Sequence, residues 1–194
     1  LQRLIEDTLR DSRWDMTYLG MQVVIEGLAL AAFQQIRDHA QNPLAAAVNA
    51  YVMQDEARHV AFGRIARRDY YPELTEKERR EREEFLVEAC FLMRDRFDAV
   101  EVWKTLGFDP GACGQYMLES GFMERFRSSL FTRIVPIVKD IGLWGETIRA
   151  GYAKMGILGY ADTDVEALQQ ADDQIAREFD ARRAQVTGTI ARAE

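Results

Sequence analysis

The sequence predicts an all-α protein, and three observations support this fold class. Helix-start and helix-stop signals divide most of the chain, whereas no stretch of useful length alternates between apolar and polar residues as a strand does. Only four of the 194 residues are proline. Hydrophobic residues make up 47% of the chain, which is enough for a sizeable core at this length and argues against disorder.

The first part of the chain is predicted to be a helical hairpin. A short amphipathic helix over residues 2–12 precedes two long helices, expected over 15–41 and 43–70. Asn42 and Pro43 supply an N-cap and a proline at the first helical position of the second long helix. The two long helices should therefore turn back on each other near Asn42.

Five further helices are expected in the rest of the chain. Thr75 and Glu78 form a capping box. Pro136 should kink or end the helix that contains it, and Thr163 should cap the last helix. The expected ranges are 76 to about 97, 110 to about 120, 122 to about 139, 142 to 155, and 164 to about 192.

A candidate domain boundary lies at Tyr71-Pro72. It separates a hairpin unit, residues 1–72, from a C-terminal helical region, residues 73–194. We expect the second region to pack on the first, so that the two form one domain overall.

Composition and charge exclude several classes of protein. The net charge of −7 argues against a nucleic-acid partner, because phosphate binding needs a concentrated basic surface. No apolar run reaches the roughly 20 residues needed to span a bilayer, and no secretory signal pattern follows Leu1. Cys90 and Cys113 have no metal-type spacing and suggest no disulfide framework. The expectation is a soluble, cytoplasmic protein that contacts neither membrane nor nucleic acid.

The most informative motif is Glu-x-x-His in the second long helix. Glu56 and His59 are three residues apart, so they share one helix face and can direct an oxygen and a nitrogen at one point. A further carboxylate, Glu26, interrupts a run of apolar or small residues in which Gln22 is the other polar residue. A carboxylate buried there without a partner should cost several kcal/mol.

The hairpin brings these residues to one level. Glu26 lies 16 residues before the turn at Asn42, and Glu56 and His59 lie 14 and 17 residues after it. At about 1.5 Å per residue, all three lie roughly 21–26 Å from the turn. Two buried carboxylates and an imidazole at one level need a cation, so Glu26, Glu56 and His59 are candidate metal ligands.

Two alternatives for the polar residues of this region stay open. Glu26 could instead pair with Arg58 or Arg64 as a buried ion pair, although such a pair needs excellent geometry to offset the cost of desolvation. Gln22 lies one turn before Glu26, and it either lines a cavity or acts as a partner behind the ligands.

Other residues have ordinary explanations. His39 is expected to be solvated at a helix end, where its position favours the cation through the helix dipole. Tyr18 and Tyr51 are candidates for a redox-active tyrosine. However, Tyr18 lies about 12 Å from Glu26 along the helix axis, and ordinary core packing is the expectation.

Residues 54–63, Gln-Asp-Glu-Ala-Arg-His-Val-Ala-Phe-Gly, resemble the last metal-binding helix of the ferritin-like superfamily. The similarity is strongest to the branch of the ribonucleotide reductase small subunit and the di-iron oxygenases, and it covers roughly residues 15–70. It implies that Asp55 accepts a hydrogen bond from a histidine ligand and so fixes the tautomer of that ligand. The metal ligands that the resemblance implies are Glu26, Glu56 and His59.

The ligand set in this chain is half of the set in that superfamily. A complete ferritin-like site has a second Glu and a second Glu-x-x-His, and the other histidine of this chain, His39, is far from the level of Glu26. We expect the chain to be the C-terminal half of a longer ferritin-like bundle whose N-terminal half completes the site. In the alternative, a homodimer builds one four-helix, two-metal site from two hairpins.

The resemblance implies an oxidoreductase. Oxygen-rich ligands with one imidazole per metal suit Fe(II) or Mn(II), and the absence of thiolates counts against structural zinc. Two irons, or manganese and iron, would activate O2 to oxidise an organic small molecule, with Glu56 bridging the metals, His59 bound terminally and Glu26 as the flexible carboxylate. The competing hypotheses are a ferroxidase or iron-handling protein and a non-catalytic ferritin-like binding or assembly protein.

Overall fold

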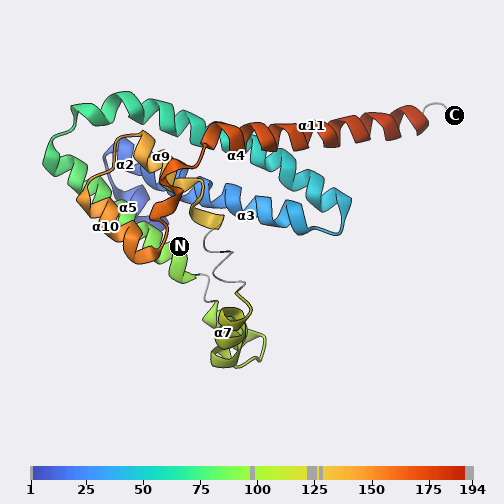
Figure 1. Ribbon diagram of the computed structural model, residues 1–194, viewed down its shortest axis with the longest axis horizontal. Helices are drawn as coiled ribbons and strands as arrows, with labels where there is room; N and C mark the ends of the chain where they lie inside the picture. The colour runs from blue at the N-terminus through green and yellow to red at the C-terminus, as the bar shows by residue number, and fades with distance from the viewer. Residues whose placement is uncertain (1, 97–98, 122–125, 127–128, 191–194) are drawn as a thin grey trace.

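The computed structural model describes residues 2–96, 99–121, 126 and 129–190 (Figure 1). Over these residues the backbone is helical with connecting turns and contains no strand, which confirms the predicted all-α class. The longest elements are the two arms of an N-terminal hairpin and the final helix, which lies along one of those arms (Figure 1).

The predicted hairpin is formed. Its second arm is α4 (Pro43–Tyr70), which begins where the sequence predicts because the Asn42 side chain accepts a hydrogen bond from the Leu44 N–H at 2.9 Å. Its first arm is one continuous helical path built from three elements, and it packs along α4 with the most extensive contact in the molecule. These elements are α2 (Trp14–Tyr18), the π-helical segment η1 (Leu19–Ile25) and α3 (Glu26–His39).

The π-helical segment is a departure from the regular helix that the sequence predicts. Its hydrogen bonds span five residues, as in the bond from the Glu26 N–H to the Met21 carbonyl. Gly20 allows the segment to lie close to its neighbours, since a Cβ there would lie 2.5 Å from Thr8 Oγ1 and 3.2 Å from Phe85 Cζ. Tertiary packing therefore sets the path of this segment.

The remaining helices agree in number and order with the prediction, with one addition. The capping box forms, because Thr75 Oγ1 donates to Glu78 Oε2 at 2.7 Å and accepts from the Glu78 N–H at 3.3 Å. Helix α6 was not predicted. With the opening helix α1 (Gln2–Arg10), the further elements are η2 (Tyr71–Glu73), α5 (Glu76–Arg96), α6 (Val100–Thr105), α7 (Pro110–Glu119), α9 (Ile134–Asp140), α10 (Glu146–Met155), η3 (Leu158–Asp162) and α11 (Val165–Ile190).

Three predicted boundaries need correction. The N-cap of α11 is Asp164, whose Oδ1 accepts from the Ala167 N–H at 2.9 Å, and not Thr163. Helix α10 begins four residues later than predicted, because Gly142 has a left-handed backbone (φ +86°) that a helix cannot include. The prediction for 122–139 lies partly outside the described residues, and so do the last two residues predicted for α11.

Pro136 interrupts the chain as expected, although it lies inside a helix. It occupies the first turn of α9, where a missing N–H costs no helical hydrogen bond. The break falls just upstream at Thr132 and Arg133, which form a turn. A continuous helix would need an N–H on Pro136 to bond to the Thr132 carbonyl.

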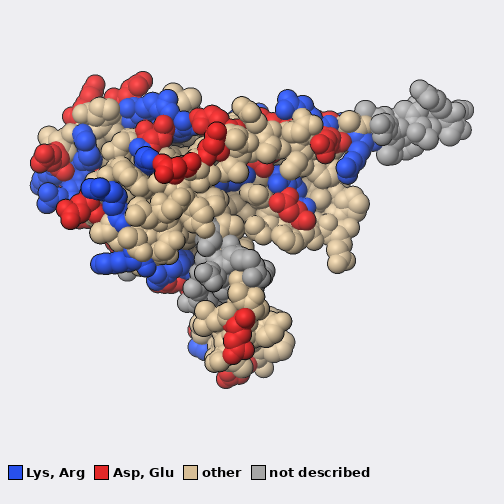
Figure 2. Space-filling model, in the orientation of Figure 1, with Lys and Arg blue, Asp and Glu red and all other residues tan. Residues whose placement is uncertain are grey.

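One hydrophobic core joins the regions on either side of Tyr71-Pro72. Tyr71 is 1% exposed and belongs to this core. Helices α5, α9 and α11 lie against the hairpin, and α10 packs on α5. Helices α6 and α7 pack on each other and form a lobe that stands away from the bundle (Figures 1 and 2). Fully buried core side chains include Leu19, Val23, Met53, Leu86, Phe131, Ile134, Ile148 and Tyr152.

The opposite side of the hairpin is partly uncovered. Val48 and Phe62 of α4 are 50% and 59% exposed, and both share a helix face with His59. Tyr18 lies beside Phe62, with ring centroids 6.3 Å apart, and Trp14 lies 5.9 Å from Tyr18. We call this side, defined by Trp14, Tyr18, Val48, His59 and Phe62, the open face.

The first arm of the hairpin is also the most apolar segment of the described chain. Over Trp14–His39, 26 residues, the most apolar window has a mean hydropathy of 1.5, and half of that window is buried inside the protein. By length and composition this helix is sufficient to cross a membrane, so the prediction that no apolar run is long enough to span a bilayer needs correction. The core helix of a soluble protein meets the same criterion.

A glycine supports the junction between α5 and α10. The Glu83 carboxylate is 4% exposed and accepts a hydrogen bond from the Gly145 N–H at 2.6 Å, directly before α10. A Cβ on Gly145 would lie 2.5 Å from Glu83 Oε2. Gly145→Ala should therefore lower the free energy of unfolding by about 1–3 kcal/mol, the usual cost of overpacking. Urea denaturation followed by circular dichroism measures the loss.

Gly159→Ala is the matched control for this prediction. Nothing lies within 4 Å of a Cβ on Gly159, so this substitution should change stability by less than about 0.5 kcal/mol. Equal losses for the two variants would show that the contact with Glu83 does not limit position 145.

Candidate metal centre

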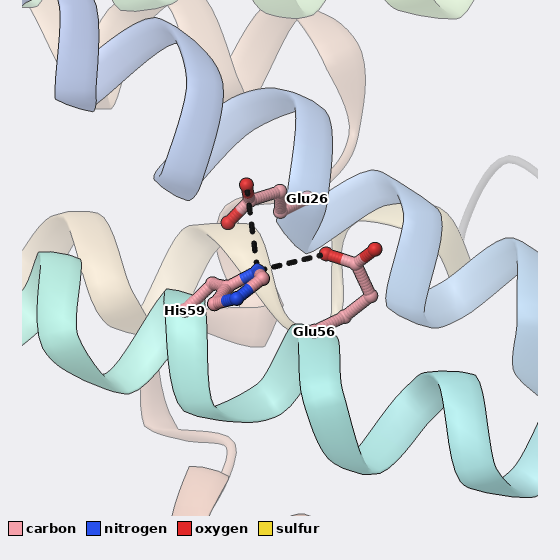
Figure 3. A group of neighbouring side chains, drawn as sticks. All are labelled: Glu26, Glu56 and His59. Carbon is pink, nitrogen blue, oxygen red and sulfur yellow. Dashed lines mark ion pairs between the residues drawn. The ribbon is translucent and has the colours of Figure 1, made fainter.

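Glu26, Glu56 and His59 converge between the two arms of the hairpin (Figure 3). One ligand atom from each lies within 4.8 Å of the other two. The imidazole Nδ1 of His59 is 3.8 Å from Glu26 Oε1 and 3.6 Å from Glu56 Oε2. The three side chains come from the level of the hairpin that their distances from the turn predict.

Each ligand owes its position to a separate local feature. Glu56 and His59 are one turn apart in the middle of α4, which has no interruption between its cap at Asn42 and Tyr70. Glu26 is the first residue after the π-helical segment. Single π-helical turns inside α-helices are frequent at functional sites, because they change which side chains face a partner helix.

The electrostatics of Glu26 favour a bound cation. Its side chain is 21% exposed, and its Oε2 atom is fully buried with no hydrogen-bond partner. Burial is the largest cause of a raised pKa, and the neighbouring Glu56 carboxylate raises it further. His59 and Arg67 act in the opposite direction without cancelling the effect. The ionised carboxylate therefore lacks sufficient positive charge in this structure.

The distances fit a metal ion with small adjustments. Two ligands that are each about 2.1 Å from a metal lie about 3 Å apart at right angles and about 4 Å apart on opposite sides. The measured separations of 3.6 and 3.8 Å fall between these limits. Two carboxylates and one imidazole are the donor set expected for Fe(II) or Mn(II).

The centre lies at the open face. His59 is 58% exposed and Glu56 25% exposed. Three ligand atoms leave the coordination sphere of an octahedral ion incomplete. Further ligands have room to approach from the side on which His59 is exposed.

The residues predicted to lie behind the ligands have different fates. The structure pairs Asp55 with Arg58 at 2.9 Å, and both side chains are 70% exposed. This ion pair faces solvent and is not a contact with an imidazole. Gln22 lies in the interior, where its Oε1 atom is buried without a hydrogen-bond partner. Its two predicted roles both remain open.

The ion-pair alternative for Glu26 does not form. Arg58 bonds to Asp55 and to the Gln54 carbonyl. Arg64 bonds to Asp140 and Glu166, on the side of the hairpin that faces α9 and α11. Both arginines therefore have other carboxylate partners.

Of the remaining predictions, one is confirmed and one is wrong. His39 is exposed at the end of α3, with Nδ1 2.9 Å from the Gln35 carbonyl, as expected. Tyr18 was expected in the core but is 39% exposed on the open face. Tyr51 hydrogen bonds to Asp180 of α11 at 2.7 Å.

Sequence reasoning missed Arg67, which lies eight residues after His59 on α4. Its side chain is 0% exposed. Nothing in the local sequence distinguishes it from Arg68, which is exposed and pairs with Asp140. Only its position on the inward face of α4 could have indicated burial.

The raised pKa of Glu26 predicts a pH-dependent stability of the metal-free protein. Below about pH 4.5 this carboxyl is protonated in both folded and unfolded states and contributes nothing. As the pH rises towards and through the raised pKa, the folded state holds the proton more tightly and stability falls. Glu26→Gln should therefore raise the thermal midpoint at pH 7 relative to the parent, and the gain should disappear near about pH 4.

Thermal melts at several pH values in chelator check this expectation. Glu84→Gln, on the exposed face of α5, is the control and should show the same small difference from the parent at every pH. A Glu26→Gln variant that is less stable than the parent at pH 7 would show that the carboxylate has a partner in the fold.

Comparisons with family models, with curated proteins and with solved structures return no match to this chain.

Proposed function

We propose that this chain supplies one half of a carboxylate-bridged dinuclear metal centre of the ferritin-like type, in a protein that oxidises an organic substrate with O2. The observation that carries this proposal is the convergence of Glu26, Glu56 and His59 within 4.8 Å between two packed helices. One Glu from one helix and Glu-x-x-His from its neighbour is the repeated unit of such centres.

The three ligands have distinct roles in this proposal. Glu56 lies between the other two and bridges the metals, His59 binds one metal terminally, and Glu26 is the carboxylate that adjusts its binding mode. The metals are two irons, or manganese and iron. When bound, they supply redox chemistry and Lewis acidity, while the protein sets the geometry of the ligands.

Charge balance indicates what completes the centre. Glu26 and Glu56 together neutralise one divalent cation, so a site for two cations needs about two more carboxylates. A second helix pair on the open face would bring them, and it would also cover the exposed side chains of Val48 and Phe62. This helix pair comes from another part of the same protein or from a second copy of the hairpin.

The surroundings favour an organic substrate over iron handling. Four aromatic side chains lie next to one another beside the centre, with ring centroids 5.0–6.3 Å apart. A path for iron would need carboxylates there instead, because hydrated iron binds to oxygen ligands. The four are Trp14, Tyr18, Phe62 and Tyr70.

Anaerobic loading with Fe(II) tests the proposal. The chain is titrated alone and together with candidate helix pairs, and native mass spectrometry gives the iron content and the number of copies. We expect two irons per completed four-helix site and O2 consumption that rises with an oxidisable apolar compound. O2 consumption that is unchanged by organic compounds and leaves ferric iron would favour a ferroxidase. Absence of iron from the chain and from all complexes would refute the proposal.

A further inference from the structure

Arg67 is a fully buried arginine with spare hydrogen-bond donors. Its Nη2 atom donates to the Tyr18 carbonyl at 2.9 Å, at the start of the π-helical segment. Its Nε and Nη1 atoms are buried and have no partner. A buried guanidinium with unused donors is expensive, because each unmade hydrogen bond costs the full desolvation of the group. Such a group needs acceptors close by.

Two buried acceptors without partners lie in the same part of the hairpin. They are Oε1 of Gln22 and Oε2 of Glu26. Gln22 meets Arg67 over Gly63, because the position of a Cβ on Gly63 lies 2.5 Å from Gln22 Oε1 and 2.8 Å from Arg67 Nη2. Gln22 is also one turn before Glu26, so amide, carboxylate and guanidinium are neighbours.

The charges of Arg67 and Glu26 act on each other. Burial lowers the pKa of Arg67, and Glu26 is among the groups that oppose this by favouring the charged guanidinium. In turn Arg67 favours the ionised form of Glu26. The interaction is directed at the inner side of the carboxylate, because Oε1 faces His59 and Oε2 is the buried atom.

If the metal centre proposed above exists, Arg67 has a role in it: we propose that Arg67 is a positioning residue whose guanidinium, with the amide of Gln22, holds the inner oxygen of Glu26 and leaves the outer oxygen to the metal. A ligand carboxylate that is fixed from behind loses less freedom when the metal binds. Loss of such an outer partner typically weakens metal binding about 10–100-fold.

Co(II) titration of the full chain provides the first test. Arg67→Met should weaken Co(II) binding about 10–100-fold and alter the visible absorption of the bound ion, whereas Arg67→Lys should recover part of the affinity. Arg82→Met is the matched control, since Arg82 is equally buried but pairs with Asp15. It should lower stability and leave the affinity of the folded protein unchanged.

The outcomes separate this inference from the proposed function. A parent chain that binds no Co(II) refutes the metal centre and, with it, the role of Arg67. A parent that binds Co(II) while Arg67→Met binds it equally or more tightly refutes the role of Arg67 alone. In that case the guanidinium serves only the Tyr18 carbonyl or repels the cation.

A second measurement needs neither metal nor a folded Arg67 variant. The ¹⁵N and ¹H resonances of the Arg67 guanidinium are recorded in metal-free protein. Glu26→Gln should shift these resonances, and Glu56→Gln, the same change at the neighbouring ligand, should leave them nearly unchanged. Resonances that do not respond to Glu26→Gln would overturn the inference.

Discussion

Glu56→Ala should abolish metal binding and leave the metal-free fold standing. Glu56 is the ligand that the two metals share, so its loss should weaken binding by more than about 100-fold, beyond the effect of losing an outer partner. The apo protein should keep or slightly raise its stability, because Glu56 is one cause of the raised pKa of Glu26 and the two carboxylates repel each other. Metal analysis and thermal melts with and without Fe(II) measure both effects.

Arg58→Ala is the matched control, since Arg58 lies on the same helix two residues from Glu56. Its ion pair with Asp55 is exposed on both sides, so its loss should cost less than about 1 kcal/mol. Metal binding should be unchanged. Equal destabilisation by both substitutions, in a parent that contains no metal, would mean that Glu56 is part of a structural charge network.

The register of the candidate centre could be predicted because it depends on short-range rules. The side-chain cap at Asn42 fixes where α4 begins, and the rise per residue then fixes the level of Glu56 and His59. The capping box at Thr75 is equally local, and the structure forms it. The caps that were misassigned, such as Thr163 for Asp164, are errors of one residue between adjacent oxygen-bearing side chains.

Features that depend on distant contacts could not be predicted. The π-helical segment is held where Gly20 meets Thr8 and Phe85, and no local pattern marks it. The burial of Arg67 depends on the Tyr18 carbonyl, 49 residues away. The exposure of Tyr18 depends on which side of the hairpin the C-terminal helices cover. In each case the deciding contact joins segments far apart in the sequence.

The C-terminal helix is attached to the hairpin by a buried charge cluster that the sequence also did not reveal. Asp172 of α11 is 5% exposed and bonds to Arg37 of α3 at 2.8 Å and to Arg133 at 2.6 Å. Both arginines are less than 10% exposed. Arg37 has a second partner in Asp38, and Arg133 has one in the neutral amide of Gln34. Asp172 is therefore the central counterion for two buried cations.

Asp172→Ala should destabilise the fold more than Gly145→Ala, Glu56→Ala or Arg58→Ala. Removing one member of a buried ion pair strands the partner charge and costs about 3–5 kcal/mol, a large share of the roughly 5–15 kcal/mol that stabilises a typical domain. Urea denaturation measures the loss. Hydrogen exchange should show α11 opening first, because its remaining contacts with α4 include the exposed bond from Tyr51 to Asp180.

Two further variants test whether stranded charge is the cause. Asp180→Ala, the same change two turns along α11 at an exposed position, should cost less than about 1 kcal/mol. Adding Arg133→Met to Asp172→Ala should recover part of the stability, because it removes the buried cation that has no other charged partner. If Asp172→Ala costs no more than Asp180→Ala, or if Arg133→Met adds a further full loss, then packing and not charge neutralisation attaches α11 to the hairpin.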